Sequence, residues 1–196
     1  MAEASSIRSV QLRNAHPHLR VPRAAVARVI ALLDAEFRML PGDLPHLSLP
    51  PARLRSLRTQ ISNLTSANHP ANRTAPSPVP SGELSIVFLT DPAIAQIHAD
   101  FMADPTATDV ITFEGDATAG LAGEICVSAD TAAAYAREHG HDFATELTLY
   151  VVHGWLHLAG YDDLAPAKKR RMRAAEARAL KLLVAADALP AFRLNR

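Results

Sequence analysis

A long apolar helix with two histidines near its end is the feature that most constrains this chain. Residues 143–160, FATELTLYVVHGWLHLAG, form one largely apolar run that ends at a glycine. His153 and His157 are four residues apart, so on a helix their imidazoles lie one above the other on the same face. Gly160 can adopt the left-handed conformation that ends helices, which turns the chain back toward that face. The run therefore predicts a buried helix with a histidine pair at its C-terminal end.

The acidic residues that follow complete a metal-ligand pattern. HGWLHLAGYDD fits the frame HxxxHxxGxxD, which places Asp163 at the third-ligand position, so we predict a metal site of His153, His157 and Asp163. Metzincin-type zinc proteases use this frame with histidine last and a glutamate general base after the first histidine. Here that neighbour is Gly154, which cannot take up a proton, so the protease hypothesis lacks its base. The alternative without a metal is a histidine pair satisfied by hydrogen bonds on a packed helix face.

The surrounding segments predict an α+β fold, a single domain in which a small mixed sheet of about four strands is covered by helices, one of them a zincin-like metal helix. Alternating or β-branched runs predict strands at residues 6–14, 83–89, 108–113 and 121–128. Helical spacing of apolar residues predicts helices at residues 21–37, 92–102, 129–140 and 165–189. Asp91 could cap the second of these helices, and Ser128 or Asp130 the third.

The chain divides into three parts by composition. Residues 1–38 supply the first strand and helix, and residues 83–190 the main part of the domain. Between them, residues 39–82 are rich in Pro, Ser, Ala and Asn, with one possible helix at residues 52–64. We expect this segment to be a Pro-rich insertion that is partly disordered.

The net charge of zero hides a strong asymmetry. Residues 1–80 hold 10 Lys+Arg and 4 Asp+Glu, giving +6; residues 81–164 hold 1 and 14, giving −13; residues 165–196 hold 9 and 2, giving +7. The acidic middle carries the histidine pair and suits capture of a cation, while basic flanks suit a polyanion such as nucleic acid. The alternative is that folding interleaves these charges and cancels the field.

Other features of the sequence point to a cytoplasmic protein. The only cysteine, Cys126, lies in an apolar run and is expected to be a small buried residue. No run approaches the roughly 20 apolar residues that span a bilayer, and the N-terminal residues lack the apolar core of a secretory signal. We therefore predict a cytoplasmic location and no membrane partner.

The motif resembles the signature HGxLHLxGYDH of the YbeY family, which are bacterial metal-dependent endoribonucleases. TDVITF is similar to the family's TDVLSF strand, AGEICVS to its GDIxIC strand, EHGHDFATEL to its GHSxxxEL helix entry, and RRMRAAEARAL to the Met and Glu pattern of its last helix. The resemblance covers residues 83 to about 182, and SVQLRN with its helix is similar to the family's first strand and helix. Residues 39–82 show no counterpart in this reading.

The sequence departs from the family pattern at two positions. Asp163 stands where the family has its third metal histidine, and Met102 stands about where the family has an arginine. An aspartate can bind zinc at about 2.0 to 2.2 Å. Two neutral imidazoles and one carboxylate leave a formal charge of about +1 on a divalent site, against about +2 for three histidines, which reduces acidification of the attacking water and makes other divalent metals plausible.

The resemblance implies a single-strand-specific endoribonuclease that acts in rRNA maturation, at the 3′ end of 16S rRNA, and in ribosome quality control. It implies one Zn²⁺ per chain and single-stranded RNA, rRNA and the ribosome as partners. Lys168, Lys169, Arg170 and Arg171 could contact RNA phosphates or form a solvated face. Asp162 is a candidate proton-transfer group, and it could equally shape the loop. The alternative from another class is a catalytically weak or inactive RNA- or ribosome-binding protein whose metal is structural.

Overall fold

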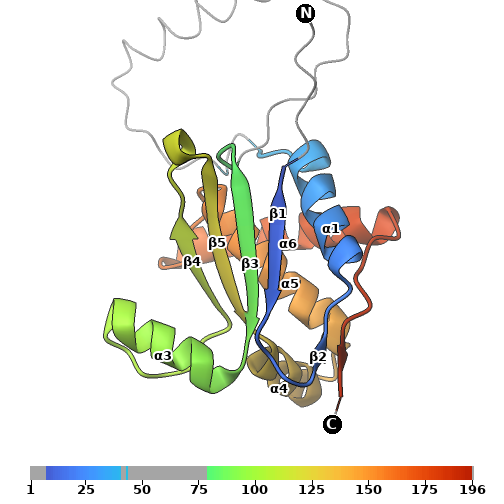
Figure 1. Ribbon diagram of the computed structural model, residues 1–196. Coiled ribbons are helices and arrows are strands. Elements are labelled where there is room, and N and C mark those ends of the chain that lie inside the picture. The colour runs from blue at the N-terminus through green and yellow to red at the C-terminus, as the bar shows by residue number, and fades with distance from the viewer. Residues whose placement is uncertain (1–7, 41–42, 44–78, 196) are drawn as a thin grey trace, which may run out of the picture.

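A four-stranded mixed sheet lies at the centre of the structure, a computed structural model that describes residues 8–40, 43 and 79–195 (Figure 1). The strand order is β1-β3-β5-β4. β1, β3 and β5 are parallel, and β4 is antiparallel to β5. Their bounds are Val10–Asn14 (β1), Glu83–Leu89 (β3), Val110–Glu114 (β4) and Leu121–Ser128 (β5). A second pair, β2 (Leu19–Arg20) and β6 (Arg193–Leu194), joins the two ends of the described chain.

Helices cover both faces of the sheet. They are α1 (Arg23–Glu36), α3 (Asp91–Met102), α4 (Ala129–His139), α5 (Phe143–Leu158) and α6 (Pro166–Ala185), with a short 3₁₀ turn, η1, at Ala117–Ala119. α3 lies in front of the lower part of the sheet in Figure 1, α5 and α6 lie behind the sheet, and α1 lies beside β1. The predicted small mixed sheet of four strands covered by helices is confirmed.

The two faces of β3 explain this layering. Leu84, Ile86 and Phe88 alternate with Val87 and Leu89, and all five are buried. The first set packs in the main core with α1, α5 and α6, and the second packs with α3. Because successive side chains of a strand point to opposite faces, an almost continuous apolar strand needs cover on both sides. β3 is therefore an interior strand with an apolar core on each face.

α5 carries the histidine pair and is the most deeply buried of the described helices. Trp155 and Leu156 are fully buried, and the Trp155 indole N–H donates to Asp34 of α1 at 3.2 Å. Gly154 lies against β5, where an added Cβ would be 2.4 Å from Cγ2 of Ile125. A side chain at residue 154 would therefore collide with the sheet. The glycine lets α5 pack closely on β5, which accounts for its place beside the first histidine.

The predicted N-cap is confirmed for α4 and wrong for α3. Ser128 caps α4 by accepting from the Thr131 N–H at 3.1 Å, as predicted. Asp91 does not cap α3, whose N-cap is Thr90. The Asp91 carboxylate accepts instead from the hydroxyls of Ser128 and Thr131, because the ends of parallel strands β3 and β5 lie side by side. The Asp91 carboxylate therefore binds residues that are close in space but about 40 positions away in sequence, and it does not cap its own helix.

The predicted insertion is described only at its ends. The possible helix at residues 52–64 lies outside the described residues. Within residues 39–82, Asp43 and Val79 are buried, and Arg8 donates to the carbonyls of Val79, Pro80 and Gly82. Both ends of the segment are thus held against the domain. Across the described part of the chain, no helix combines the length and apolar character that a membrane crossing needs.

Candidate metal centre

His153 and His157 lie at the C-terminal end of α5 with their Nε2 atoms facing each other at 2.9 Å. The Nδ1 of His153 donates to Oε1 of Glu176 at 2.6 Å, and the Nδ1 of His157 donates to the carbonyl of Tyr161 at 3.1 Å. Both acceptors are oxygens that hold the ring proton on Nδ1. The Nε2 lone pairs therefore point at the same place. Two acceptor nitrogens in this arrangement need a cation or a proton between them.

Asp163, on the loop after α5, brings a carboxylate close to both Nε2 atoms. Its Oδ1 lies 3.9 Å from Nε2 of His157 and its Oδ2 lies 4.0 Å from Nε2 of His153. Gly160 has a φ of 93°, in the left-handed region that glycine favours, and this turn brings the loop back over the histidines. One ligand atom from each of the three residues lies within 4.8 Å of the other two. Within the described residues, no other three His, Cys, Asp or Glu side chains bring ligand atoms so close together.

The three side chains fit a divalent ion. With zinc–ligand bonds of about 2.0 to 2.2 Å, the ligand atoms of a tetrahedral site lie about 3.3 Å apart. The observed separations, 2.9 Å between the nitrogens and 3.9 to 4.0 Å to the carboxylate, bracket that value. The side chains of His153, His157 and Asp163 are 15%, 27% and 33% exposed, so the site opens to solvent. Three protein ligands with solvent access are typical of catalytic rather than structural zinc sites.

The two histidines have pKa shifts of opposite sign. Burial lowers the pKa of His153, but the hydrogen bond and charge of Glu176, aided by Asp109 and Asp163, outweigh burial and raise it overall. Burial and the neighbouring His153 lower the pKa of His157, against smaller contributions from Asp163 and the Tyr161 carbonyl. His157 therefore keeps a free Nε2 lone pair to a lower pH than an ordinary histidine does. That is the protonation state a metal ligand needs.

Asp162 points to a different set of partners from those of Asp163. Its Oδ1 accepts from the Leu164 N–H at 2.7 Å, and its Oδ2 forms an ion pair with Lys168 at the start of α6. These contacts lower the pKa of Asp162. Of the predicted basic residues, Lys168, Lys169 and Arg170 are exposed and Arg171 is half-buried. They follow the metal loop directly because α6 begins at Pro166.

Two groups that orient the site were not predicted. Glu176 lies on α6, 23 residues after the histidine it contacts, and the Tyr161 contact uses a main-chain carbonyl. A carboxylate on another helix gives no periodic signal in the sequence, although the Met and Glu pattern of the last helix includes Glu176. Any residue at position 161 would supply the carbonyl. Sequence reasoning therefore predicted three candidate ligands that lie together, but not the groups that hold the two histidine rings.

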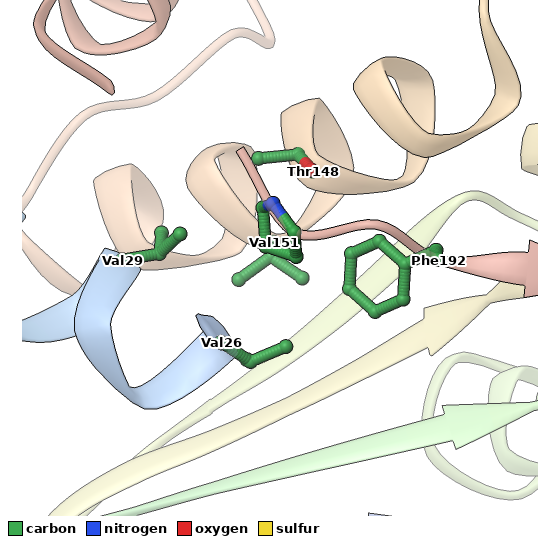
Figure 2. Close-up of a pocket in the computed structure, with 6 residues that line it drawn as sticks. Val26, Val29, Thr148, Val151 and Phe192 are labelled. Atoms are coloured by element: carbon green, nitrogen blue, oxygen red, sulfur yellow. The ribbon is translucent and has the colours of Figure 1, made fainter. Parts of the chain in front are cut away.

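A crevice between α1, α5 and the C-terminal segment is not the candidate site. It is lined by Val26, Val29, Thr148, Val151, Pro190 and Phe192 (Figure 2). Its polar side chain, Thr148, donates its hydroxyl to the Ala144 carbonyl at 2.6 Å within α5. Apolar walls with a satisfied hydroxyl offer no reacting group, so this crevice is part of the core packing.

Fold and site together define an α+β protein that presents two histidines and a carboxylate from one helix and its following loop. The family model described as Endoribonuclease YbeY matches residues 47–184. Endoribonuclease YbeY of Sinorhizobium fredii is 32% identical over 161 residues, covering 79% of this chain and 91% of the relative. That of Protochlamydia amoebophila is 42% identical over 100 residues, covering 49% of this chain and 67% of the relative. The solution structure of TM1509 from Thermotoga maritima has a TM-score of 0.49 and 18% identity over 90% of each chain.

The chain belongs to the YbeY family of endoribonucleases. The resemblance predicted from HGWLHLAGYDD and its neighbouring segments is thereby confirmed. The family match starts at residue 47, inside the segment predicted as an insertion. The division of the chain at residues 39 and 82 stays a prediction.

Proposed function

We propose that this protein is a single-strand-specific, metal-dependent endoribonuclease that acts in rRNA maturation at the 3′ end of 16S rRNA and in ribosome quality control. It works with one divalent ion, zinc, on His153, His157 and Asp163. The observation that carries the proposal is the 2.9 Å distance between the two Nε2 atoms, in rings whose Nδ1 atoms each donate to a fixed oxygen acceptor. Family membership supplies RNA hydrolysis as the reaction. Ribosome maturation also implies the predicted cytoplasmic location.

The ion supplies Lewis-acid chemistry to the phosphodiester, offsetting the negative charge that develops on the phosphoryl oxygens. The chain's own part is to hold the ligands rigidly. Glu176 keeps His153 in the tautomer whose Nε2 is unprotonated, and the Tyr161 carbonyl does the same for His157. Asp163 reduces the net charge of the site and leaves one side open to solvent.

Asp162 serves the loop rather than proton transfer in this proposal. Its carboxylate is held by the Leu164 N–H and the Lys168 ammonium, and its lowered pKa makes it a poor acceptor of a proton near neutral pH. By linking the loop to α6, it fixes the segment that carries Asp163. This is a positioning role, next to a ligand.

The first turns of α6 provide the attraction for RNA. Lys169 and Arg170 are exposed and directly follow the loop that carries Asp163. Basic side chains supply most of the affinity for a polyanion, and they are needed here because the stretch from residue 81 to residue 164 is strongly acidic. This basic end of α6 would therefore bind the phosphate backbone next to the candidate metal site.

The test is cleavage of single-stranded RNA by the purified protein with and without chelator. We expect cleavage that needs the metal and is lost in His157→Ala, while Asp163→Ala binds less than one metal ion per chain by elemental analysis. Glu138→Gln, an exposed carboxylate change on α4, is the control and should cleave as the wild type does. RNA that is bound but stays intact in the metal-loaded wild type would contradict the enzyme and favour a binding protein.

A further inference from the structure

We propose that Asp43 is a positioning residue of the metal site, acting on His157 through Tyr161. The Tyr161 hydroxyl donates to Oδ2 of Asp43 at 2.7 Å, and the main-chain carbonyl of the same tyrosine accepts from Nδ1 of His157 at 3.1 Å. The side chain of one residue is thus anchored at Asp43 while its backbone sets the tautomer of a predicted ligand. The inference rests on the proposed function, because it concerns the same metal centre.

The surroundings of Asp43 show that this anchor is built into the fold. Its side chain is 7% exposed, and Oδ2 accepts from the Leu40 N–H at 2.8 Å and from Arg178 of α6 at 2.6 Å, in addition to Tyr161. A buried carboxylate destabilises a fold unless it is paired and hydrogen-bonded. Three donors on a single oxygen meet that need, so the carboxylate, and with it the tyrosine hydroxyl, has a fixed position.

Tyr161 can transmit this position because it is held at both ends. Its ring is buried and packs edge-on against Phe37, with centroids 6.4 Å apart. Its N–H donates to the Leu156 carbonyl at 3.0 Å, so its peptide group is tied to the last turn of α5. Release of the hydroxyl would loosen the residue whose carbonyl orients His157. It would also loosen the loop that reaches Asp163 two residues later.

α6 contributes to both histidines through this arrangement. Glu176 contacts His153 directly, and Arg178 contacts Asp43 and, at 3.2 Å, the Tyr161 hydroxyl. Arg178 also lies over the Phe37 ring at 5.4 Å. The outer nitrogens of the two ligand rings are therefore set by residues that lie on or contact one turn of a single helix.

The test compares Tyr161→Phe and Asp43→Ala with matched controls. Thr148→Val removes one buried hydroxyl from α5, and Asp91→Ala removes a carboxylate that accepts from the hydroxyls of Ser128 and Thr131. Zinc affinity is measured without RNA, by competition with a chromophoric chelator. We expect about 10-fold weaker binding in Tyr161→Phe and Asp43→Ala, the lower end of the effect for groups that orient ligand histidines. The controls should keep wild-type zinc affinity even where they lower the unfolding midpoint.

A second readout separates positioning from stability. In ¹⁵N NMR of the metal-free protein, His157 should carry its proton on Nδ1, and Tyr161→Phe should mix the two tautomers, whereas Thr148→Val should not. The double variant Asp43→Ala/Tyr161→Phe should bind zinc no more weakly than Asp43→Ala alone, because both changes break the same hydrogen bond, the one between the Tyr161 hydroxyl and Asp43. If Asp43→Ala does not fold, Asp43→Asn, which keeps an acceptor oxygen, takes its place and should lie between the wild type and Tyr161→Phe.

Two results would overturn the inference. One is wild-type zinc affinity in a folded Tyr161→Phe variant, and the other is an unchanged His157 tautomer in that variant. Failure of the proposed function looks different, because a wild-type protein that cleaves no RNA can still show the tautomer change and the loss of zinc affinity.

Discussion

Burial has the largest effect on the pKa of both histidines, and among single residues Glu176 has the largest effect on His153. The pKa of His153 is raised above its usual value of about 6.5 by the hydrogen bond and charge of Glu176, against the opposing effect of burial. A carboxylate on an outer nitrogen both fixes the tautomer and strengthens the ring as a ligand. The same contact therefore affects metal binding and the stability of the metal-free protein.

Glu176→Gln should change the pH dependence of stability in the metal-free protein. Because the folded pKa of His153 exceeds its unfolded value, the Glu176 contact stabilises the fold fully below about pH 6.5 and is lost as pH rises through the folded pKa. The wild type should thus exceed the variant in free energy of unfolding most near pH 6, and the gap should narrow toward pH 8. The lowered pKa of His157 acts in the opposite sense in both proteins.

Urea unfolding at several pH values in the presence of chelator measures this difference. Zinc affinity of Glu176→Gln should fall about 10- to 100-fold, the usual effect of removing such a partner. Glu138→Gln, on the exposed surface of α4, is the control and should follow the wild type throughout. A gap that widens with rising pH would contradict the assigned role of Glu176.

At this scale the sequence predicted three candidate ligands, which stay a prediction, but not the groups that hold their rings. His153, His157 and Asp163 belong to one helix and the loop after it, so local spacing predicted where their side chains gather. Asp43 lies in the segment predicted as an insertion, yet it is buried beside Tyr161. No local pattern marks such a residue, because its partners come from α5's loop and from α6.

At the scale of elements, α5 and its contact with β5 determine where the candidate metal centre lies. The apolar run and Gly160 predicted this helix and its end, because helix burial and termination depend on nearby residues. Its distance from the sheet depends on Gly154, whose missing Cβ is a packing requirement of the assembled fold. The sequence showed that residue 154 cannot be a base; the structure adds that it is a close-packing position.

Gly154→Ala should therefore destabilise the protein by about 1 to 3 kcal/mol, the usual effect of overpacking a core. The added Cβ would lie 2.4 Å from Cγ2 of Ile125, so α5 or β5 must shift. Thermal or urea unfolding measures the change. In an Ile125→Ala background, which lacks that methyl group, the same substitution should cost less. Equal costs in both backgrounds would mean that the contact with Ile125 is not the cause.

The basic end of α6 can be tested by the salt dependence of RNA binding. Lys169→Ala/Arg170→Ala should weaken binding of single-stranded RNA and reduce the slope of log affinity against log salt by about 0.7 to 1.4, because each phosphate contact on a single strand contributes about 0.7. Lys181→Ala/Arg137→Ala removes two exposed charges elsewhere, on α6 and α4, and should leave the slope unchanged. Equal slopes for the two double variants would mean that Lys169 and Arg170 are solvated and do not contact RNA phosphates.

At the scale of the whole molecule, the sequence predicted the layers of the fold but not their order in space. Apolar alternation and β-branched runs identified the four strands. The neighbour of each strand depends on contacts far apart in sequence, as in the pairing of Val10 with Leu84 and of Val110 with Val127. Local signals do not encode these partners. For the same reason, sequence reasoning predicted that the Asp91 side chain caps its own helix, whereas its carboxylate binds the hydroxyls of Ser128 and Thr131.

The part of the chain between α1 and β3 gives a prediction at this scale. Deleting residues 65–77, TSANHPANRTAPS, should leave zinc affinity and the unfolding midpoint near wild type, because this stretch has the composition of a linker. The deletion spares Val79 and Pro80, whose carbonyls bind Arg8. Extending it through residue 81 should lower the unfolding midpoint. Loss of zinc binding in the shorter deletion would refute the linker prediction.

The register of the sheet also has a consequence for the order in which the protein assembles. β4 and β5 are neighbours in sequence and pair residue 110 with residue 127, whereas β1 must find β3 across most of the first half of the chain. Contacts between distant residues form late because closing a long loop costs entropy before any pairing offsets it. The hairpin beneath the metal helix should therefore be the folding nucleus and β1 the last strand to dock. In native-state hydrogen exchange, amides of β1 should be the first in the sheet to open.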